Sequence, residues 1–218
     1  MSRWLPSCWQ QSVFYALLIS ALLLIGKGLY IPLKAEVAQQ LMQSAWERAL
    51  TFPDKQSGTG RDKIAHIARP WPWADTQIIG KLKYKDHEDF VLAGLNTRNL
   101  AFGPSALMNF SDNFNKEQSK NVVIAGHRDT HFAYLKKVKV GDIFSFEQAD
   151  AHTKFQVTDV MVVPETAFEV TAPTNVPALT LITCYPFESI EINPRFRYVV
   201  RAIELPTAQL VARQPLSF

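Results

Sequence analysis

Short runs of β-forming residues, each bounded by turn residues, recur from about residue 75 onward in this 218-residue chain. The runs are rich in Val, Ile, Phe and Tyr, and several alternate apolar with polar residues, as half-buried strands do. Seven of them lie at 77–82, 90–92, 121–125, 143–146, 154–163, 179–183 and 197–204. About eight short strands in roughly 140 residues favour a closed or nearly closed β-barrel over a βαβ sheet. We therefore predict a mainly β domain over residues 75–218.

The N-terminal part of the chain is strongly apolar. Residues 12–33 read SVFYALLISALLLIGKGLYIPL, and the most apolar stretch, Val13 to Ile25, is broken only by Ser20. About 20 apolar residues cross a bilayer, and Lys27 near one end can reach the interface. We predict a transmembrane signal anchor over residues 12–33, preceded by a short cytoplasmic segment at 1–11.

Two other interpretations of this apolar segment stay open. A cleavable signal peptide fits the length of the apolar run, but Gly26-Lys27-Gly28 is a poor cleavage site for a signal peptidase. A buried core helix is the third possibility. The positive-inside rule does not settle the orientation, because Arg3 precedes the span while Lys34 and Arg48 follow it.

A predicted helix and a linker fill residues 34–74. Residues 35–50 (AEVAQQLMQSAWERAL) are almost all good helix formers, with an apolar stripe at three- and four-residue spacing. This pattern predicts a helical stalk that packs on the β domain or on a neighbouring molecule. A polar linker follows at 51–62, and Pro70 and Pro72 then exclude helix.

Charge and cysteine content exclude several classes of protein. The chain has 23 Lys and Arg against 20 Asp and Glu, without long charged blocks, so we expect no nucleic-acid partner. The two cysteines, Cys8 and Cys184, lie on opposite sides of the predicted span, so they do not form a disulfide framework. The thiol of Cys184 is then either a small buried hydrophobe or a nucleophile.

Three polar side chains stand at the ends of predicted strands. His127 opens the loop after the strand 121–125, Cys184 ends the strand 179–183, and Arg197 begins the strand 197–204. These three could converge at one end of a barrel. A thiolate needs a nearby group that manages protons, which imidazole does near neutrality. A guanidinium can stabilise the negative charge that develops on a carbonyl oxygen.

The three segments that carry these residues are GHRDTHF (126–132), TLITC (180–184) and RYVVRA (197–202). In this order and at these separations they resemble the signature segments of sortases, and the ungapped RYVVRA match selects Arg197 over Arg195 and Arg201. The segments KAEVAQQLMQSAW, PWPWADT and TCYPF together resemble those of the proteobacterial, Gram-negative sortase group. The resemblance runs from the predicted anchor to about Glu204.

This resemblance implies an eight-stranded sortase barrel with short helices and a cysteine transpeptidase activity. Cys184 would be the nucleophile, His127 the proton donor and Arg197 the oxyanion donor, while Thr183, Phe187 and Ile190 would line the substrate site. The substrate would be a surface protein with a C-terminal LPXTG-like sorting signal, cleaved after threonine and transferred to an amine acceptor. The enzyme would be anchored in the inner membrane and would face the periplasm.

Other roles for single residues remain possible. Cys184 taken alone is more often a buried structural thiol, and Asp129 could orient His127 or simply form the turn. His127 and His131 are four apart, as zinc ligands can be, but GHRDTH offers no third ligand. Four glutamates at 165, 169, 188 and 191 form no recognisable calcium loop. We expect no metal and no cofactor.

Two rival functions follow from the same sequence. A cysteine peptidase would use the same residues and end with water in place of an amine. A membrane-tethered β-barrel binding module would carry an inert thiol at Cys184.

Overall fold

The computed structural model describes residues 8–51, 69–70, 76–107, 120–148 and 151–206. The predicted cytoplasmic segment lies largely outside these residues. The predicted linker at 51–62, apart from Thr51, and the boundary between residues 74 and 75 also lie outside them. The chain forms two compact units, residues 1–41 and residues 42–218.

Helix α1 (Cys8–Thr51) is one continuous helix that includes the predicted anchor and the predicted stalk. The apolar side chains along its first part are exposed, among them Leu17 (66%) and Leu24 (71%). Side chains at 27 and 29–36 lie outside the described part of the chain. Among the side chains that are described, no helix combines the length and hydropathy needed to cross a membrane.

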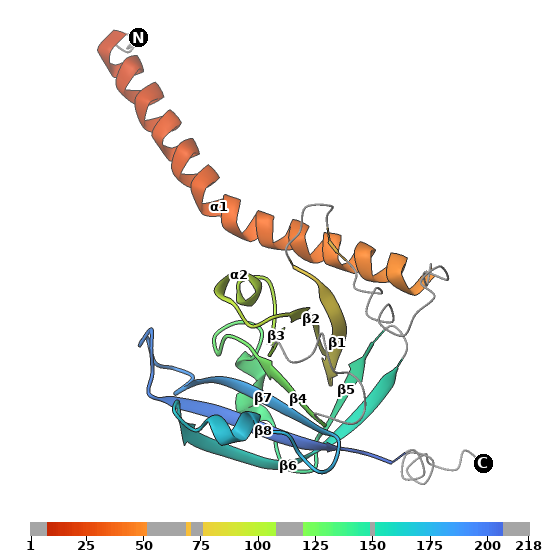
Figure 1. The fold of residues 1–218 in the computed structure, drawn as a ribbon. Helices are drawn as coiled ribbons and strands as arrows, with labels where there is room; N and C mark the ends of the chain where they lie inside the picture. Colours follow the sequence, from red (N-terminus) through yellow and green to blue (C-terminus); the bar gives the residue numbers. More distant parts are fainter. Residues whose placement is uncertain (1–7, 52–68, 71–75, 108–119, 149–150, 207–218) are drawn as a thin grey trace, which may run out of the picture. The chain divides into compact units, whose positions relative to one another are not determined.

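Eight strands close into a barrel in the order β1-β2-β3-β4-β7-β8-β6-β5 (Figure 1). The strands are β1 (Ile78–Tyr84), β2 (His87–Ala93), β3 (Ser105–Ala106), β4 (Asn121–Ala125), β5 (Ile143–Glu147), β6 (His152–Pro164), β7 (Ala178–Tyr185) and β8 (Phe196–Glu204). Within the described ranges, three short helices lie between them: α2 (Thr97–Leu100), η3 (Ala133–Lys137) and η4 (Phe168–Thr171). The ladder β4–β7 is parallel, and β7–β8 is antiparallel.

The prediction of a mainly β domain with a barrel of about eight strands is confirmed. Each of the seven predicted runs overlaps one strand of the barrel. The strand that the sequence did not indicate is β3, which consists of Ser105 and Ala106 alone. It bridges β2 in parallel and β4 in antiparallel orientation, and so closes the barrel between them.

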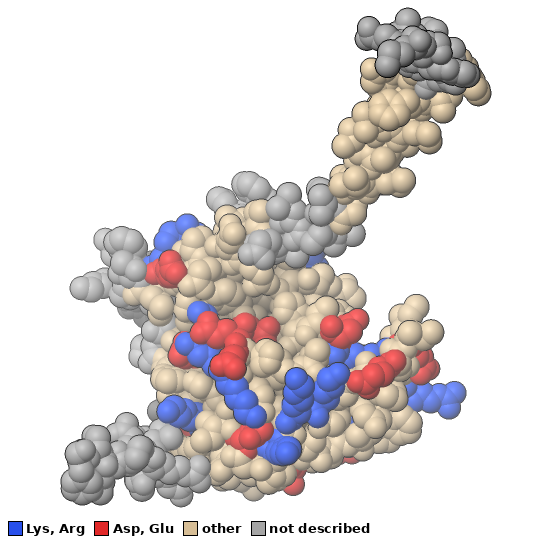
Figure 2. All heavy atoms as spheres, turned by 180° about the vertical axis from the view of Figure 1, so that it is seen from behind, with Lys and Arg blue, Asp and Glu red and all other residues tan. Residues whose placement is uncertain are grey.

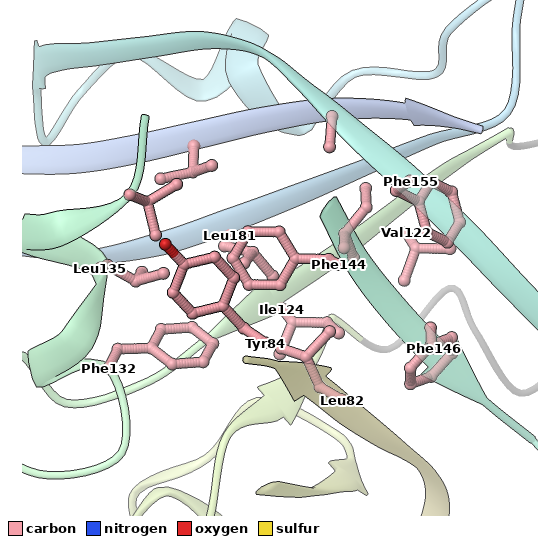
Figure 3. Close-up of a cluster of buried hydrophobic side chains, with 14 of the residues drawn as sticks. Leu82, Tyr84, Val122, Ile124, Phe132, Leu135, Phe144, Phe146, Phe155 and Leu181 are labelled. Carbon is pink, nitrogen blue, oxygen red and sulfur yellow. The ribbon is translucent and has the colours of Figure 1, made fainter. Parts of the chain in front are cut away.

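The barrel interior is filled by aromatic and branched aliphatic side chains from all the longer strands. Leu82 and Tyr84 of β1 meet Phe144 of β5 and Leu181 of β7 in this cluster (Figure 3). The Tyr84 ring stacks on Phe144 with 4.8 Å between ring centroids, and its hydroxyl donates to Asp142 Oδ2 at 2.7 Å. A closely packed interior fixes the ends of the strands, and the polar residues at those ends therefore keep their positions.

A second apolar cluster joins the end of α1 to the barrel unit. Met42, Ala45 and Trp46 are 1–4% exposed and pack with Ile78 and Leu92, both fully buried. The part of the predicted apolar stripe formed by Met42, Ala45 and Trp46 therefore packs against the β domain and contributes to its core.

Trp46→Ala should destabilise the folded chain by about 3–5 kcal/mol, because it removes a large buried side chain and leaves a cavity. Urea unfolding of the full-length chain measures this change. Leu50 is on the same helix and is 49% exposed, so Leu50→Ala should change stability by only about 0.5 kcal/mol. Equal effects of the two substitutions would contradict packing of α1 on the barrel.

Charged side chains of both signs intermingle on the face shown in Figure 2. Opposite charges also pair between strands, since Lys83 Nζ of β1 lies 3.0 Å from Glu88 of β2 and 2.9 Å from Glu147 of β5. The hydrogen bonds that the Lys83 ammonium donates to Glu147 and Glu88 raise its pKa. Neighbouring charges on this part of the surface therefore compensate one another.

Candidate active site

The ends of β4 and β7 are fastened together directly beside His127. The two strands run parallel with Ala125 opposite Ile182, and the N–H of Gly126 donates to the Ile182 carbonyl at 3.1 Å. The Thr183 hydroxyl then donates to the Gly126 carbonyl at 2.7 Å. Continuing this register by two residues places His127 beside Cys184.

Glycine is required at position 126 for a steric reason. A Cβ atom there would lie 2.8 Å from the Phe132 ring, which is completely buried. Because the chain must pass this close to the ring, the loop leaves β4 at a fixed angle, and the Phe132 N–H donates to the His127 carbonyl at 3.0 Å. The backbone of the loop that carries His127 is therefore held from both sides.

Cys184 and Arg197 are direct cross-strand partners in the β7–β8 ladder. Directly opposed residues in an antiparallel pair have their Cα atoms about 5 Å apart, and their side chains project from the same face. Cys184 is thus placed between Arg197 on one side and the extension of β4 on the other.

Strand periodicity places the side chains of Cys184 and Arg197 outside the barrel. The inward face of these strands is marked by core residues: Val122 and Ile124 on β4, Leu179 and Leu181 on β7, Val200 and Ala202 on β8. Alternation directs Cys184 and Arg197 to the outer face, and an extended β4 would direct His127 there too. The thiol is free and half-buried, and the imidazole is exposed. The sequence prediction that the three residues share one end of the barrel is consistent with this arrangement.

The guanidinium of Arg197 is held by three acceptors. Its Nη1 donates to the carbonyls of Pro194 at 2.5 Å and Phe196 at 3.0 Å, and its Nη2 donates to Glu165 Oε2 at 3.1 Å. Arg201 is engaged elsewhere, since its Nη2 donates to the Val170 carbonyl at 2.9 Å. This contact fastens the η4 segment to the outer face, so the two arginines have separate partners.

Arg128, next to His127, clamps the loop between β7 and β8. Its Nη2 donates to the carbonyls of Ser189 at 2.6 Å and Glu191 at 2.5 Å. Lys136 adds an exposed ion pair to Glu188 at 3.1 Å. The loop that begins directly after β7 is therefore tied to the segment that follows His127.

Arg128→Ala should raise amide hydrogen exchange within residues 187–193 by about tenfold or more, since hydrogen bonds to a charged group contribute about 1.5–3 kcal/mol. Exchange followed by mass spectrometry measures this directly. Lys136→Ala is the matched control, because the exposed pair with Glu188 should contribute little. Unchanged exchange in the Arg128 variant would show that the clamp does not order the loop.

The three residues predicted to line a substrate site have different environments. Thr183 is 2% exposed, so its hydroxyl serves the β4–β7 contact described above. Phe187 is partly buried and packs edge-on against Tyr198 at 5.0 Å. Ile190 is fully exposed at the tip of the clamped loop. Contact of any of the three with a substrate stays a prediction.

A histidine–carboxylate pair lies nearby, but it involves His131 and not His127. His131 Nδ1 is 3.1 Å from Asp89 Oδ1, and the two residues border a cavity of about 320 Å³ together with Tyr134. Burial, followed by the charge of Asp89, raises the pKa of the Tyr134 hydroxyl. Asp129, considered above as a partner for His127, is exposed, and its side chain makes no hydrogen bond or ion pair with the residues that the structure describes.

The structure gives no support for a metal in this region. Within the described ranges, no three His, Cys, Asp or Glu side chains are grouped so that they could hold a metal ion. Two of the glutamates weighed for calcium have other partners, Arg197 for Glu165 and Lys136 for Glu188.

A comparison with models of protein families identifies the family of this chain. The family model described as "Sortase domain" matches residues 83–204, which is more than half of the chain. The chain belongs to the sortase family. This family consists of cysteine transpeptidases, so the protein is an enzyme of that class, as the resemblance had implied. A search of curated proteins found no match.

Solved sortase structures share the fold of this sortase. Sortase A of Listeria monocytogenes has 26% identity and a TM-score of 0.52, over 59% of this chain and 88% of that chain. A lid mutant of sortase A from Corynebacterium diphtheriae has 23% identity and a TM-score of 0.54, over 78% and 95%. The sortase D5 transpeptidase of Clostridium perfringens has 17% identity and a TM-score of 0.54, over 75% and 99%.

Proposed function

We propose that this sortase cleaves a sorting signal through a thioester on Cys184, with His127 as proton donor and acceptor and Arg197 as oxyanion donor. The observation that carries the proposal is the cross-strand pairing of Cys184 with Arg197, beside the loop that begins at His127. This pairing supports the proposal because it sets a thiol opposite a guanidinium, next to the strand that leads to His127, in a member of a family of cysteine transpeptidases.

The chemistry proceeds in two halves. The Cys184 thiolate attacks the carbonyl carbon of the threonine, and Arg197 stabilises the oxyanion with hydrogen bonds. The amide C–N bond breaks while His127 protonates the departing amine. An incoming amine then attacks the thioester carbonyl and gives its proton to His127, and the Cys184 thiolate leaves. The new amide bond has the energy of the bond that was broken, so no external energy source is needed.

The substrate that we propose is a surface protein with a C-terminal LPXTG-like signal, and the acceptor is a primary amine. Neither the signal letters nor the acceptor is fixed by the residues of the site. The proposal rests on the resemblance of the GHRDTHF, TLITC and RYVVRA segments to those of sortases. The segments KAEVAQQLMQSAW, PWPWADT and TCYPF support our further proposal that the enzyme belongs to the proteobacterial group. Phe187 and Ile190, on the loop after Cys184, are the residues that we propose to contact the signal.

Product analysis separates transfer from hydrolysis. The full-length chain would be incubated with an LPXTG-containing peptide, with and without a small primary amine, and the products weighed by mass spectrometry. A transpeptidase should give the amide of the amine whenever it is present. Exclusive formation of the free threonine carboxylate in both reactions would show a cysteine peptidase.

We also propose that residues 12–33 anchor the enzyme in the inner membrane, with the catalytic domain in the periplasm. Support comes from the apolar sequence and from the exposed apolar side chains of α1 between Val13 and Ile25. An anchored chain should stay in the membrane fraction after alkaline carbonate extraction, and protease added to spheroplasts should degrade its catalytic domain. Release by carbonate would contradict the anchor, and protection from protease would contradict the orientation.

A further inference from the structure

Three of the five N–H donors of Arg197 are already used within the protein. Both hydrogens on Nη1 go to the backbone carbonyls of Pro194 and Phe196, and one on Nη2 goes to Glu165. The Nε hydrogen and the second Nη2 hydrogen make no hydrogen bond to any residue that the structure describes. The existing contacts therefore set the direction in which the two remaining donors point.

The position of Glu165 is fixed by its own backbone, independently of its contact with Arg197. It is the first residue after β6, where the β6–β8 ladder ends with Pro164 opposite Phe196. Its N–H donates to the Arg195 carbonyl at 2.8 Å, so its backbone continues the pairing by one step. The carboxylate thus reaches Arg197 from an anchored position beside the same strand.

The ion pair is too exposed to serve chiefly for stability. The side chains of Arg197 and Glu165 are 28% and 47% exposed, and pairs of this kind contribute little to the free energy of folding. Its main consequence is geometric, because a guanidinium held at both Nη atoms has less freedom to rotate, and Arg197 is the cross-strand partner of Cys184.

We propose that Glu165 is a positioning residue for Arg197. Its carboxylate, together with the two carbonyls, holds the guanidinium so that its two remaining donors face the carbonyl oxygen attacked by Cys184. The inference rests on the proposed function, since it assigns Glu165 a task only if Arg197 is the oxyanion donor.

The test compares Glu165→Ala with Glu165→Gln in the full-length chain, using single-turnover acylation by an LPXTG-containing peptide. We expect Glu165→Ala to slow acylation about tenfold with KM nearly unchanged, because a displaced donor weakens transition-state stabilisation. Glu165→Gln keeps an acceptor oxygen and should recover most of the rate. Glu169→Ala is the matched control, because Glu169 is exposed on the same connection between β6 and β7.

A double-mutant cycle separates this inference from the proposed function. In an Arg197→Ala background, Glu165→Ala should cause no further loss, because the group that it positions is absent. Equal losses in both backgrounds, or normal acylation by Glu165→Ala, would overturn the positioning role. If Arg197→Ala itself acylates normally, the oxyanion assignment fails, and the positioning role fails with it.

A spectroscopic measurement tests the inference without any substrate. Nitrogen NMR of the full-length chain should show restricted rotation for the Nη groups of Arg197. Glu165→Ala should release that rotation, whereas Glu169→Ala should not. Free rotation of the Arg197 guanidinium in the unsubstituted chain would overturn the proposal even if the peptide is not a substrate.

Discussion

Replacement of Cys184 by alanine is expected to abolish cleavage of an LPXTG-containing peptide, with turnover falling to the level of buffer alone. No other group among the described residues can form a thioester, because Cys184 is the free cysteine of the catalytic unit. Water and the remaining donors cannot replace the covalent step that divides the reaction into two easier halves. Release of the C-terminal peptide fragment, followed by chromatography, measures the effect.

Two controls accompany the Cys184→Ala variant. Cys8→Ala should keep full activity, because residue 8 begins α1 and belongs to the unit 1–41, whereas the barrel belongs to the unit 42–218. The Cys184 variant should also unfold at the same urea concentration as the unsubstituted chain, since a half-buried thiol loses little on truncation. Residual cleavage by a folded Cys184→Ala chain would move the nucleophile to another residue.

Replacement of Arg197 by alanine is expected to slow acylation of Cys184 by about 10²-fold, which corresponds to about 3 kcal/mol for one lost oxyanion donor. The loss should appear in kcat and in kcat/KM alike, because the donor acts on charge that exists only in the transition state. Stopped-flow mixing with a chromogenic LPXTG-containing peptide would follow the acylation phase.

Two further variants, Arg195→Ala and Arg197→Lys, are compared with Arg197→Ala. Arg195 is exposed two residues earlier, and Arg195→Ala should acylate at nearly the normal rate. Lysine at position 197 should recover only part of the activity, because an ammonium cannot reproduce the fixed fork of donors. Loss of activity in Arg195→Ala together with normal activity in Arg197→Ala would transfer the oxyanion role to Arg195.

Much of the barrel follows from patterns that are local in the sequence. Val, Ile and Phe in alternation locate the longer strands to within a few residues, and the strand ends place Cys184 and Arg197. β3 was not predicted, because a strand of only two residues is too short to show a periodic pattern in the sequence. Its pairing with β2 and β4 depends on a closed barrel that brings distant segments together.

The three candidate catalytic residues could be named from their segments, but their supporting contacts could not. Glu165 lies 32 residues before Arg197, and Asp89 lies 42 residues before His131. Arg128 donates to backbone carbonyls, and because every residue has a carbonyl, the residue types in the sequence cannot indicate which ones are bound. Such contacts arise from tertiary proximity, and a single sequence carries no local signal for them.

The packing of the end of α1 could be predicted only in part from the sequence. The apolar stripe through Met42 and Trp46 predicts that one side of the helix is covered, and two partners were equally compatible with it, the β domain or a neighbouring molecule. The structure places Met42, Ala45 and Trp46 against Ile78 and Leu92. An amphipathic pattern therefore identifies a buried face without identifying what buries it.

The most direct test of acyl transfer through Cys184 is intact mass spectrometry of the full-length chain after brief incubation with an LPXTG-containing peptide and acid quenching. The account predicts an added mass equal to the peptide fragment ending at threonine, located after proteolysis on the fragment that contains Cys184, and lost on addition of hydroxylamine. Cleavage of the peptide without any adduct on Cys184, or an adduct on another residue, would contradict it.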